Sequence, residues 1–223
     1  NGQFVPNVTL RLASGGYIGG GLYHSQNLEG ALATLPGARI VCPSFADDAA
    51  GLLRTSIRSR GFTLFIEPKA LYNSVEAATI VPDDFEVPFG KARIRREGSD
   101  LSIITYGNTT HFCLNVAERL EKEGSWSVEV IDLRSLIPLD KETIYASVKK
   151  TSKALVVHED KVFSGFGAEI AAGIGTELFR YLDAPVQRVG SVFTPVGFHP
   201  ILEKAILPTE DKIYDAARTL LEY

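Results

Sequence analysis

Residues 101–133 read LSIITYGNTTHFCLNVAERLEKEGSWSVEVIDL, and the pattern in this stretch decides the fold class. The apolar run LSIITY is typical of a buried strand, and the polar residues 108–110 are candidates for a helix N-cap. Phe112, Val116 and Leu120 then recur at the four-residue spacing of one helix face, and WSVEVIDL follows as a second apolar strand. A strand, a helix and another strand in this order predict a parallel unit of sheet and helix.

The same alternation continues on both sides of this unit. Toward the C-terminus the patterns predict helices over 140–150, 167–182 and 210–223 and strands over 153–159 and 185–189. Toward the N-terminus they predict strands over 8–12, 39–43 and 62–68 and helices over 26–35 and 47–59. We therefore predict an α/β protein with two doubly wound domains whose sheets are mostly parallel.

One stretch interrupts the alternation. Residues 81–100, VPDDFEVPFGKARIRREGSD, combine prolines, glycines and many charges without clear periodicity. Such a segment is typical of a domain boundary, which we place between about Ile80 and Gly98. We expect a first domain over 1–84, a linker over 85–97 with room for one short strand, and a second domain over 98–223.

Composition narrows the functional classes. The 223 residues carry a net charge of −4, so no basic excess indicates a nucleic-acid partner. No run reaches the roughly 18 apolar residues of a membrane span. Cys42 and Cys113 lie far apart in apolar surroundings, which predicts buried thiols in a reducing compartment and no zinc site. The chain has no Met and opens on Asn1, so we expect that this residue is not a translational start.

The run GGYIGGGLYHSQ, residues 15–26, raises a question of its own. Five glycines in seven residues cost backbone entropy on folding, and they resemble a phosphate-binding loop without having its GxGxxG spacing. The later GFGAEI, residues 165–170, also departs from the dinucleotide pattern, because Ile170 stands where a glycine is needed. For this second motif we favour close packing of a helix on a strand over nucleotide binding.

The four histidines are candidates of unequal weight. His24 follows flexible backbone and can exchange a proton near pH 7, so a functional role and a role in local helix entry both stay open. His158 ends a predicted strand beside Glu159, where a structural His–Glu pair is favoured over catalysis. We expect His111 to be a solvated residue of a first helical turn, and the role of His199 is open.

Longer motifs carry a family resemblance. The stretches GGGLYHSQNLEG, PGARIVCPSFADDAAGLLRTSIR, FIEPKALY, VPFGKARIRREGSDLSIITYGN, VEVIDLRSLIPLD and GFGAEIAAGI together resemble the beta subunit of thiamine diphosphate-dependent 2-oxoacid dehydrogenases, in the family's order. LYHSQ and FIEPK are most similar to the branched-chain branch, with the pyruvate branch next. The resemblance implies the C-terminal part of a pyrimidine-binding domain followed by a transketolase C-terminal-like domain.

The resemblance also implies an active site and an assembly. His24 matches the family's active-site histidine, and Gly20, Gly21, Tyr23 and Gln26 would line its substrate and cofactor pocket. An alpha subunit, or an alpha part of a fused chain, would hold the diphosphate and Mg²⁺ of thiamine diphosphate. A second beta subunit and the dihydrolipoyl acyltransferase core would be further partners. The expected compartment is the bacterial cytoplasm or the mitochondrial matrix.

A potassium site of some relatives corresponds to a further set of positions. They are Val8, Thr9, Ser56, Ser59 and Gly61. Relatives carry a carboxylate where Ser59 stands, so this chain would offer the ion one charge fewer. Relatives also commonly have an acid where Phe193 precedes Thr194 and Pro195, so subunit contacts are expected to differ there.

The resemblance sets the functional expectation and its alternatives. We expect the beta part of an enzyme that decarboxylates a branched-chain 2-oxoacid, or pyruvate, and passes the acyl group to lipoyl. The family's carboxylate that contacts the aminopyrimidine would lie upstream of Asn1, so we expect the 223-residue chain alone to be inactive. The alternatives are a transketolase-like enzyme of the same superfamily and a non-catalytic module for dimerisation or docking.

Overall fold

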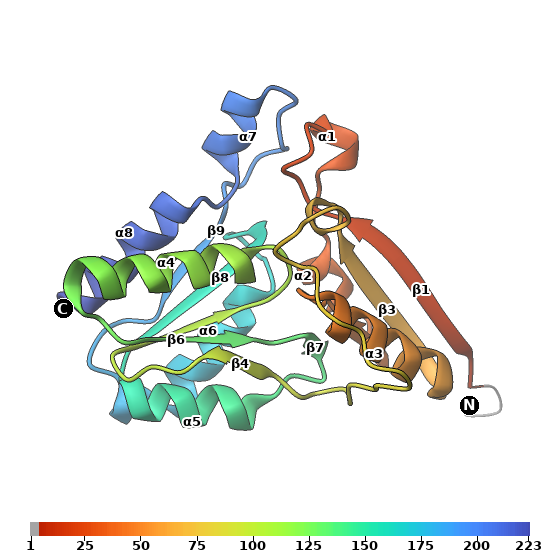
Figure 1. The fold of residues 1–223 in the computed structure, drawn as a ribbon, viewed down its shortest axis with the longest axis horizontal. Helices are drawn as coiled ribbons and strands as arrows, with labels where there is room; N and C mark the ends of the chain where they lie inside the picture. The colour runs from red at the N-terminus through yellow and green to blue at the C-terminus, as the bar shows by residue number, and fades with distance from the viewer. Residues whose placement is uncertain (1–4) are drawn as a thin grey trace.

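The computed structural model describes residues 5–223, which form two sheets covered by helices (Figure 1). The first sheet has the order β1 (Asn7–Ser14), β3 (Gly61–Pro68), β2 (Ala38–Val41) and β7 (Ser135–Ile137). Its first three strands are parallel, and β7 is antiparallel to β2. The register aligns Leu10 with Leu64 and Ile40 with Leu64, so the carboxyl ends of β1, β3 and β2 open at one edge.

The second sheet is the unit that the opening stretch predicts. Its order is β4 (Arg93–Arg96), β6 (Val128–Asp132), β5 (Leu101–Thr105), β8 (Ala154–Lys161) and β9 (Gln187–Ser191). All neighbours are parallel except β4, which runs antiparallel to β6 along the edge. Together the two mostly parallel sheets confirm the predicted α/β class.

The helices cover this second sheet on both faces. Helices α4 (Thr109–Gly124) and α8 (Glu210–Leu221) bury one apolar cluster with Leu101, Ile103 and Leu155 of the strands. Helices α5 (Lys141–Thr151) and α6 (Gly167–Glu177) lie on the opposite face, where Ile104 and Val156 point. Alternation of side chains along β5 therefore feeds two separate clusters, which is the arrangement of a doubly wound sheet.

The cluster beneath α5 and α6 also reaches into the first sheet. Ile40 of β2 and Leu64 and Ile66 of β3 are buried in the same contiguous group as Ile104 and Ile131. The far side of the first sheet packs on helix α3 (Ala46–Arg58), where Leu52 and Phe65 form a smaller cluster. One core thus joins the two sheets.

Several elements differ from the predicted ones. The expected helix over 26–35 is reduced to α2 (Glu29–Leu32). The Gly30 N–H donates to the Asp160 carboxylate and not to a carbonyl of a preceding helical turn. Sequence patterns did not predict α1 (Gly21–His24), α7 (Pro200–Ile206), β7 or the short 3₁₀ turn η1 (Lys69–Leu71). The predicted helix over 167–182 ends as α6 at Glu177, and its last part forms the 3₁₀ turn η2 (Phe179–Tyr181). These elements are too short to show periodicity, and tertiary contacts hold them.

The two sheets do not follow the predicted domain boundary strictly, because two strands join a sheet outside their predicted domain. Strand β4 lies within the predicted linker 85–97 and forms the edge of the second sheet. Strand β7 lies in the predicted second domain but completes the first sheet. The division at 84 and 98 stays a prediction about the chain. Within residues 5–223, no helix combines the length and apolar character needed to cross a bilayer.

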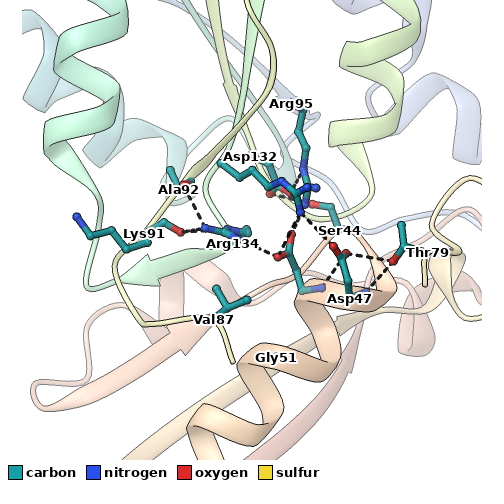
Figure 2. Close-up of polar contacts among 12 residues, drawn as sticks. Ser44, Asp47, Gly51, Thr79, Val87, Lys91, Ala92, Arg95, Asp132 and Arg134 are labelled. Carbon is teal, nitrogen blue, oxygen red and sulfur yellow. Dashed lines mark hydrogen bonds and ion pairs between the residues drawn. The ribbon is translucent and has the colours of Figure 1, made fainter. Parts of the chain in front are cut away.

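A buried ion network fixes the contact between the sheets (Figure 2). Asp48, at the start of α3 and fully buried, pairs with Arg95 of β4 and accepts a 2.8 Å hydrogen bond from Arg134. Arg95 also reaches Asp132, at the end of β6, over 2.7 Å. Arg134 donates further to the carbonyls of Lys91 and Ala92. Each charged side chain of this network therefore has a partner of opposite charge and further hydrogen bonds, which the burial of a charge requires.

The first prediction concerns this network. Asp48→Ala leaves two buried guanidinium groups without their shared carboxylate, so we expect the free energy of unfolding to fall by about 3–5 kcal/mol. Urea denaturation of the 223-residue chain measures this loss. Glu222→Ala removes only the exposed pair with Arg218 and is the control, for which we expect little change. Equal losses in the two variants would contradict the role assigned to Asp48.

Candidate active site

The glycine-rich loop continues from the carboxyl end of β1. Ser14 ends the strand, and residues 15–20 lead into α1, whose last residue is His24. Loop and helix stand beside α7 in Figure 1, and Gly21 lies against Phe198, which precedes α7. Because β1 and β3 are parallel, this loop lies at the carboxyl edge of the first sheet, which is the usual position of ligand sites in such sheets.

The predicted pocket residues lie together on this segment. His24 and Tyr23 are exposed, Tyr23 to 86%, and their side chains are accessible from outside the chain. Gly21 has a φ of +60°, a conformation that a side chain disfavours. Gln26 donates to the Leu22 carbonyl over 3.0 Å and accepts from Lys161 over 3.1 Å. The structure therefore offers an imidazole and a phenol at the end of a short, tethered helix.

Carboxylates from the C-terminal half contact the loop backbone. Glu159, on β8, accepts a hydrogen bond from the Gly16 N–H. Glu203, on α7, accepts from the N–H groups of Ile18 and Gly19, each over 3.3 Å. Successive loop amides of this kind can bind anions, and here two carboxyl groups of the same chain accept from them. The sequence did not indicate either contact with the loop, since the hydrogen-bonded residues are 143 to 185 positions apart.

Burial shifts the pKa values of the acids at this edge. Burial raises the pKa of Glu159 to about 8, and the Gly16 N–H opposes that shift. Burial raises the pKa of Glu29 to about 7, with Asp160 adding to the effect. The Oε2 atom of Glu29 and the Tyr106 hydroxyl are buried without a hydrogen-bond partner among residues 5–223. Proton uptake by these carboxyl groups avoids burying their charge.

The structure contradicts the predictions for two histidines and gives a role to a third, whose role the sequence left open. His111 is buried, and its Nε2 lies 2.8 Å from the Ser44 carbonyl, so the prediction of a solvated residue is wrong. The favoured His158–Glu159 pair is also wrong, because alternation along β8 turns the two side chains to opposite faces. Both ring nitrogens of His158 lack a partner within the described chain, and burial lowers its pKa to about 4. His199 accepts from the Ile201 N–H and caps α7.

The second glycine motif is explained by packing. Gly167 begins α6, and an added Cβ there would overlap the His158 ring. A Cβ on Gly165 would meet the Lys161 carbonyl and the same ring. This confirms that GFGAEI serves close approach of a helix to a strand.

The five positions of the expected potassium site lie at the other edge of the first sheet. Val8, Thr9 and Gly61 lie at the paired amino ends of β1 and β3, and Ser59 caps the nearby end of α3. The Ser56 hydroxyl donates to the Leu52 carbonyl over 2.7 Å. Among residues 5–223, no group of three or more His, Cys, Asp or Glu side chains is arranged to hold a metal ion. Whether the oxygens at these positions bind potassium stays a prediction.

Comparisons with family models and with known proteins show the family of this chain. Residues 1–75 match the model of the transketolase pyrimidine-binding domain, and residues 90–213 match that of the transketolase C-terminal domain. The chain is 41% identical to the 2-oxoisovalerate dehydrogenase subunit beta of Bacillus subtilis, over 100% of this chain and 68% of that protein. The chain belongs to the beta-subunit family of the 2-oxoacid dehydrogenases. The resemblance identified from the motifs is thereby confirmed, and the family is one of thiamine diphosphate-dependent oxidoreductases.

Other members of the beta-subunit family are almost equally similar. The pyruvate dehydrogenase E1 component subunit beta of Bacillus subtilis is 40% identical over 100% of this chain and 67% of its own length. The mitochondrial 2-oxoisovalerate dehydrogenase subunit beta 2 of Arabidopsis thaliana is 42% identical over 97% of this chain and 59% of its own length. The chain therefore spans about three fifths to two thirds of these relatives.

Solved structures support the fold of this family member. A structure described as a split gene transketolase, inactive beta4 tetramer, superposes with a TM-score of 0.76 at 21% identity, covering 96% of this chain and 66% of that one. A transketolase mutant from Pichia stipitis gives 0.66 at 13% identity, covering 97% and 30%. At these identities the likeness concerns the fold alone.

The second prediction tests the close approach to the loop. Gly15 has a φ of +88°, and an added Cβ would lie 2.7 Å from Oε1 of Glu159. Gly19 has a φ of +63° and open space around the same position, so it is the matched control. Both alanine variants incur the left-handed strain of about 1–2 kcal/mol, but we expect Gly15→Ala to lose more unfolding free energy in urea. Equal losses would show that Glu159 does not constrain Gly15.

The third prediction concerns pH. The folded pKa of Glu159 is about 8 against an ordinary value of 4.5, so the folded state binds more protons than the unfolded state between these values. Unfolding free energy should therefore fall as pH rises from about 5 to about 8 and level off above the folded pKa. Glu159→Gln removes this contribution and should flatten the slope in urea titrations, whereas Glu210→Gln, at an exposed position, should not. An unchanged slope in Glu159→Gln would contradict the raised pKa.

Proposed function

We propose that this chain forms the beta part of the decarboxylating component of a 2-oxoacid dehydrogenase complex. Its reaction is oxidative decarboxylation of a branched-chain 2-oxoacid, or pyruvate, with transfer of the acyl group to lipoyl. The observation that carries the proposal is the 41% identity to a 2-oxoisovalerate dehydrogenase subunit beta along the whole chain. Identity to the pyruvate subunit is 40%, so LYHSQ and FIEPK are the features that favour the branched-chain substrate.

His24 is the proposed catalytic residue. Its imidazole is exposed at the end of α1, on a loop at the carboxyl edge of a parallel sheet, where a bound substrate can reach it. An imidazole can accept and donate a proton near pH 7, which suits proton handling and charge stabilisation during acyl transfer to the lipoyl sulfur. Gly20, Gly21, Tyr23 and Gln26 are the proposed lining of the same pocket.

The proposed cofactor is thiamine diphosphate with Mg²⁺, and the loop fits only part of it. When bound, the cofactor supplies the electron-accepting centre at which the 2-oxoacid loses CO₂. Tyr23 is exposed and could contact its rings, whereas Gly21 is buried against Phe198. Glu159 and Glu203 already occupy the loop amides, and their carboxyl groups make this a poor place for a diphosphate. We therefore assign the diphosphate and Mg²⁺ to an alpha subunit, and we keep potassium at the 8–9 and 56–61 positions as a proposal.

Partners follow from the exposed apolar surface near His24. Leu22 and Tyr23 of α1 and Phe198, Ile201 and Leu202 beside or within α7 are all exposed, Phe198 to 75%. Neighbouring apolar groups of this size favour contact with another protein. We assign them to an alpha subunit or a second beta subunit, with the acyltransferase core as a further partner.

In this assembly residues 1–84 form the pyrimidine-binding part, residues 85–97 form the linker, and residues 98–223 form the C-terminal domain. The proposed compartment is the cytoplasm of a bacterium or a mitochondrial matrix.

A substrate panel tests the function. The natural chain is assembled with its alpha subunit, thiamine diphosphate, Mg²⁺ and a lipoylated acceptor, and is given 2-oxoisovalerate, pyruvate and sugar phosphates. Reduction of the acceptor with either 2-oxoacid is the expected result. Activity with sugar phosphates alone would favour the transketolase-like alternative, and inactivity of a correctly assembled complex would favour a docking module.

The fourth prediction concerns His24. His24→Ala should lower acyl transfer to the lipoyl acceptor by about 10²- to 10⁴-fold while folding is retained, since general acid–base groups contribute this much. His199→Asn is the matched control, because Asn can replace the N-cap of α7 at another exposed histidine. A loss below about threefold for His24→Ala would show that His24 is structural.

A further inference from the structure

We propose that Glu203 and Glu159 are positioning residues that hold the glycine-rich loop and thereby set the place of His24. This inference rests on the proposed catalytic function of His24. It assigns a task to two carboxyl groups that come from β8 and α7, both of them distant from the loop in sequence.

Glu203 makes the more extended contact. Its Oε1 accepts from two consecutive amides, Ile18 and Gly19, over 3.3 Å each. The residue is 8% exposed, although its helix α7 lies on the surface. Leu207, one turn further on, fills the space where a Cβ of Gly16 would stand. The helix therefore presents a carboxylate and an apolar side chain to the same loop.

Glu159 holds the entry of the loop. Its Oε1 accepts from the Gly16 N–H, and the carboxyl group is 5% exposed. The same group lies so close to Gly15 that only a glycine fits there without displacement. Because a neutral carboxyl group still accepts a hydrogen bond through its carbonyl oxygen, this contact does not require Glu159 to be charged.

The loop needs such external contacts because it has few side chains of its own. Positive φ values occur at Gly15, Tyr17, Gly19 and Gly21, so the backbone conformation is one that an isolated chain would rarely keep. Tyr17 adds one anchor, since its hydroxyl donates to the Pro208 carbonyl over 2.8 Å and its ring meets Phe112 edge-on. The Gly15 N–H also donates to the Gln26 carbonyl over 3.2 Å. Among residues 5–223, Glu159 and Glu203 provide the side-chain hydrogen bonds to the amides of residues 15–20.

The chain after His24 is held from the same side. Lys161 donates to Gln26, and Asp160 accepts from the Gly30 N–H over 3.0 Å. His24 itself is exposed, so the backbone on either side of it determines where its imidazole lies. Loosening the loop at Ile18 and Gly19 should therefore reduce the fraction of time that His24 spends in a productive position, without altering the imidazole.

Hydrogen exchange tests the holding of the loop directly. In the natural chain assembled with its partner subunits, Glu203→Leu should speed amide exchange in residues 15–24 by about tenfold, because the Ile18 and Gly19 N–H groups lose their acceptor oxygen. Glu203→Gln keeps an acceptor oxygen and should stay within about twofold of the natural chain. Glu210→Leu, an exposed carboxylate on α8, is the control, and exchange in α5 reports whether the fold is intact.

Kinetics of the same assembly test the consequence for His24. Glu203→Leu should lower kcat for acyl transfer by about tenfold with the KM for the 2-oxoacid unchanged, and Glu203→Gln should restore it. Because the effect passes through His24, Glu203→Leu should cause no further loss in a His24→Ala background. Glu159→Leu and Glu159→Gln form the parallel pair at the entry of the loop.

The possible results separate this inference from the proposed function. Unchanged exchange in the loop of Glu203→Leu overturns the inference, whatever His24 does. Faster exchange with unchanged kcat, while His24→Ala is strongly impaired, overturns the positioning role and leaves the proposed function intact. Full activity of His24→Ala overturns both the function of His24 and the positioning role, and the exchange data still show whether the carboxylates hold the loop.

Discussion

The ion network around Asp48 is the interaction on which the arrangement of the molecule depends. Asp48 lies in the first turn of the helix that packs on the first sheet, whereas Arg95 and Asp132 belong to strands of the second. Arg134 joins them at the turn that carries the chain from one sheet to the other. Since buried charges tolerate only well-defined partners, this network permits few relative positions of the sheets. The carboxyl edges that meet around the glycine loop are fixed as a consequence.

The glycine loop shows how a flexible sequence can acquire a defined shape. Glycine allows the close approach of Glu159 and Leu207 and the positive φ values, but it also increases the entropy that folding must overcome. The compensating contacts come from β8 and α7, which are distant from the loop in sequence. The loop therefore depends on long-range order, and the run that resembles a phosphate cradle binds the protein's own carboxyl groups.

Periodic elements were predictable from the sequence, and elements held by distant contacts were not. The strands and helices of the second sheet follow from alternation and from the spacing of Phe112, Val116 and Leu120. Strand β7 has three residues and no pattern, and only the open edge of β2 explains it. His111 sits in a predicted first turn, yet the segment between β2 and α3 covers it through the Ser44 carbonyl and the Phe45 ring. Glu203 has no local feature that marks it, because its partners lie 184 and 185 residues away.

Strand β7 has a consequence for how the chain behaves as a unit. The polypeptide leaves the second sheet after Asp132, adds one strand to the first sheet at Ser135–Ile137, and returns to the second through α5. Unfolding of either sheet would therefore disrupt the connections on both sides of β7. The shared apolar core couples the two sheets further. The two halves, which match separate family models, should melt in one cooperative transition. A cut between residues 85 and 92 would leave the first fragment without β7, and would leave β7 in the second fragment without the sheet that it completes.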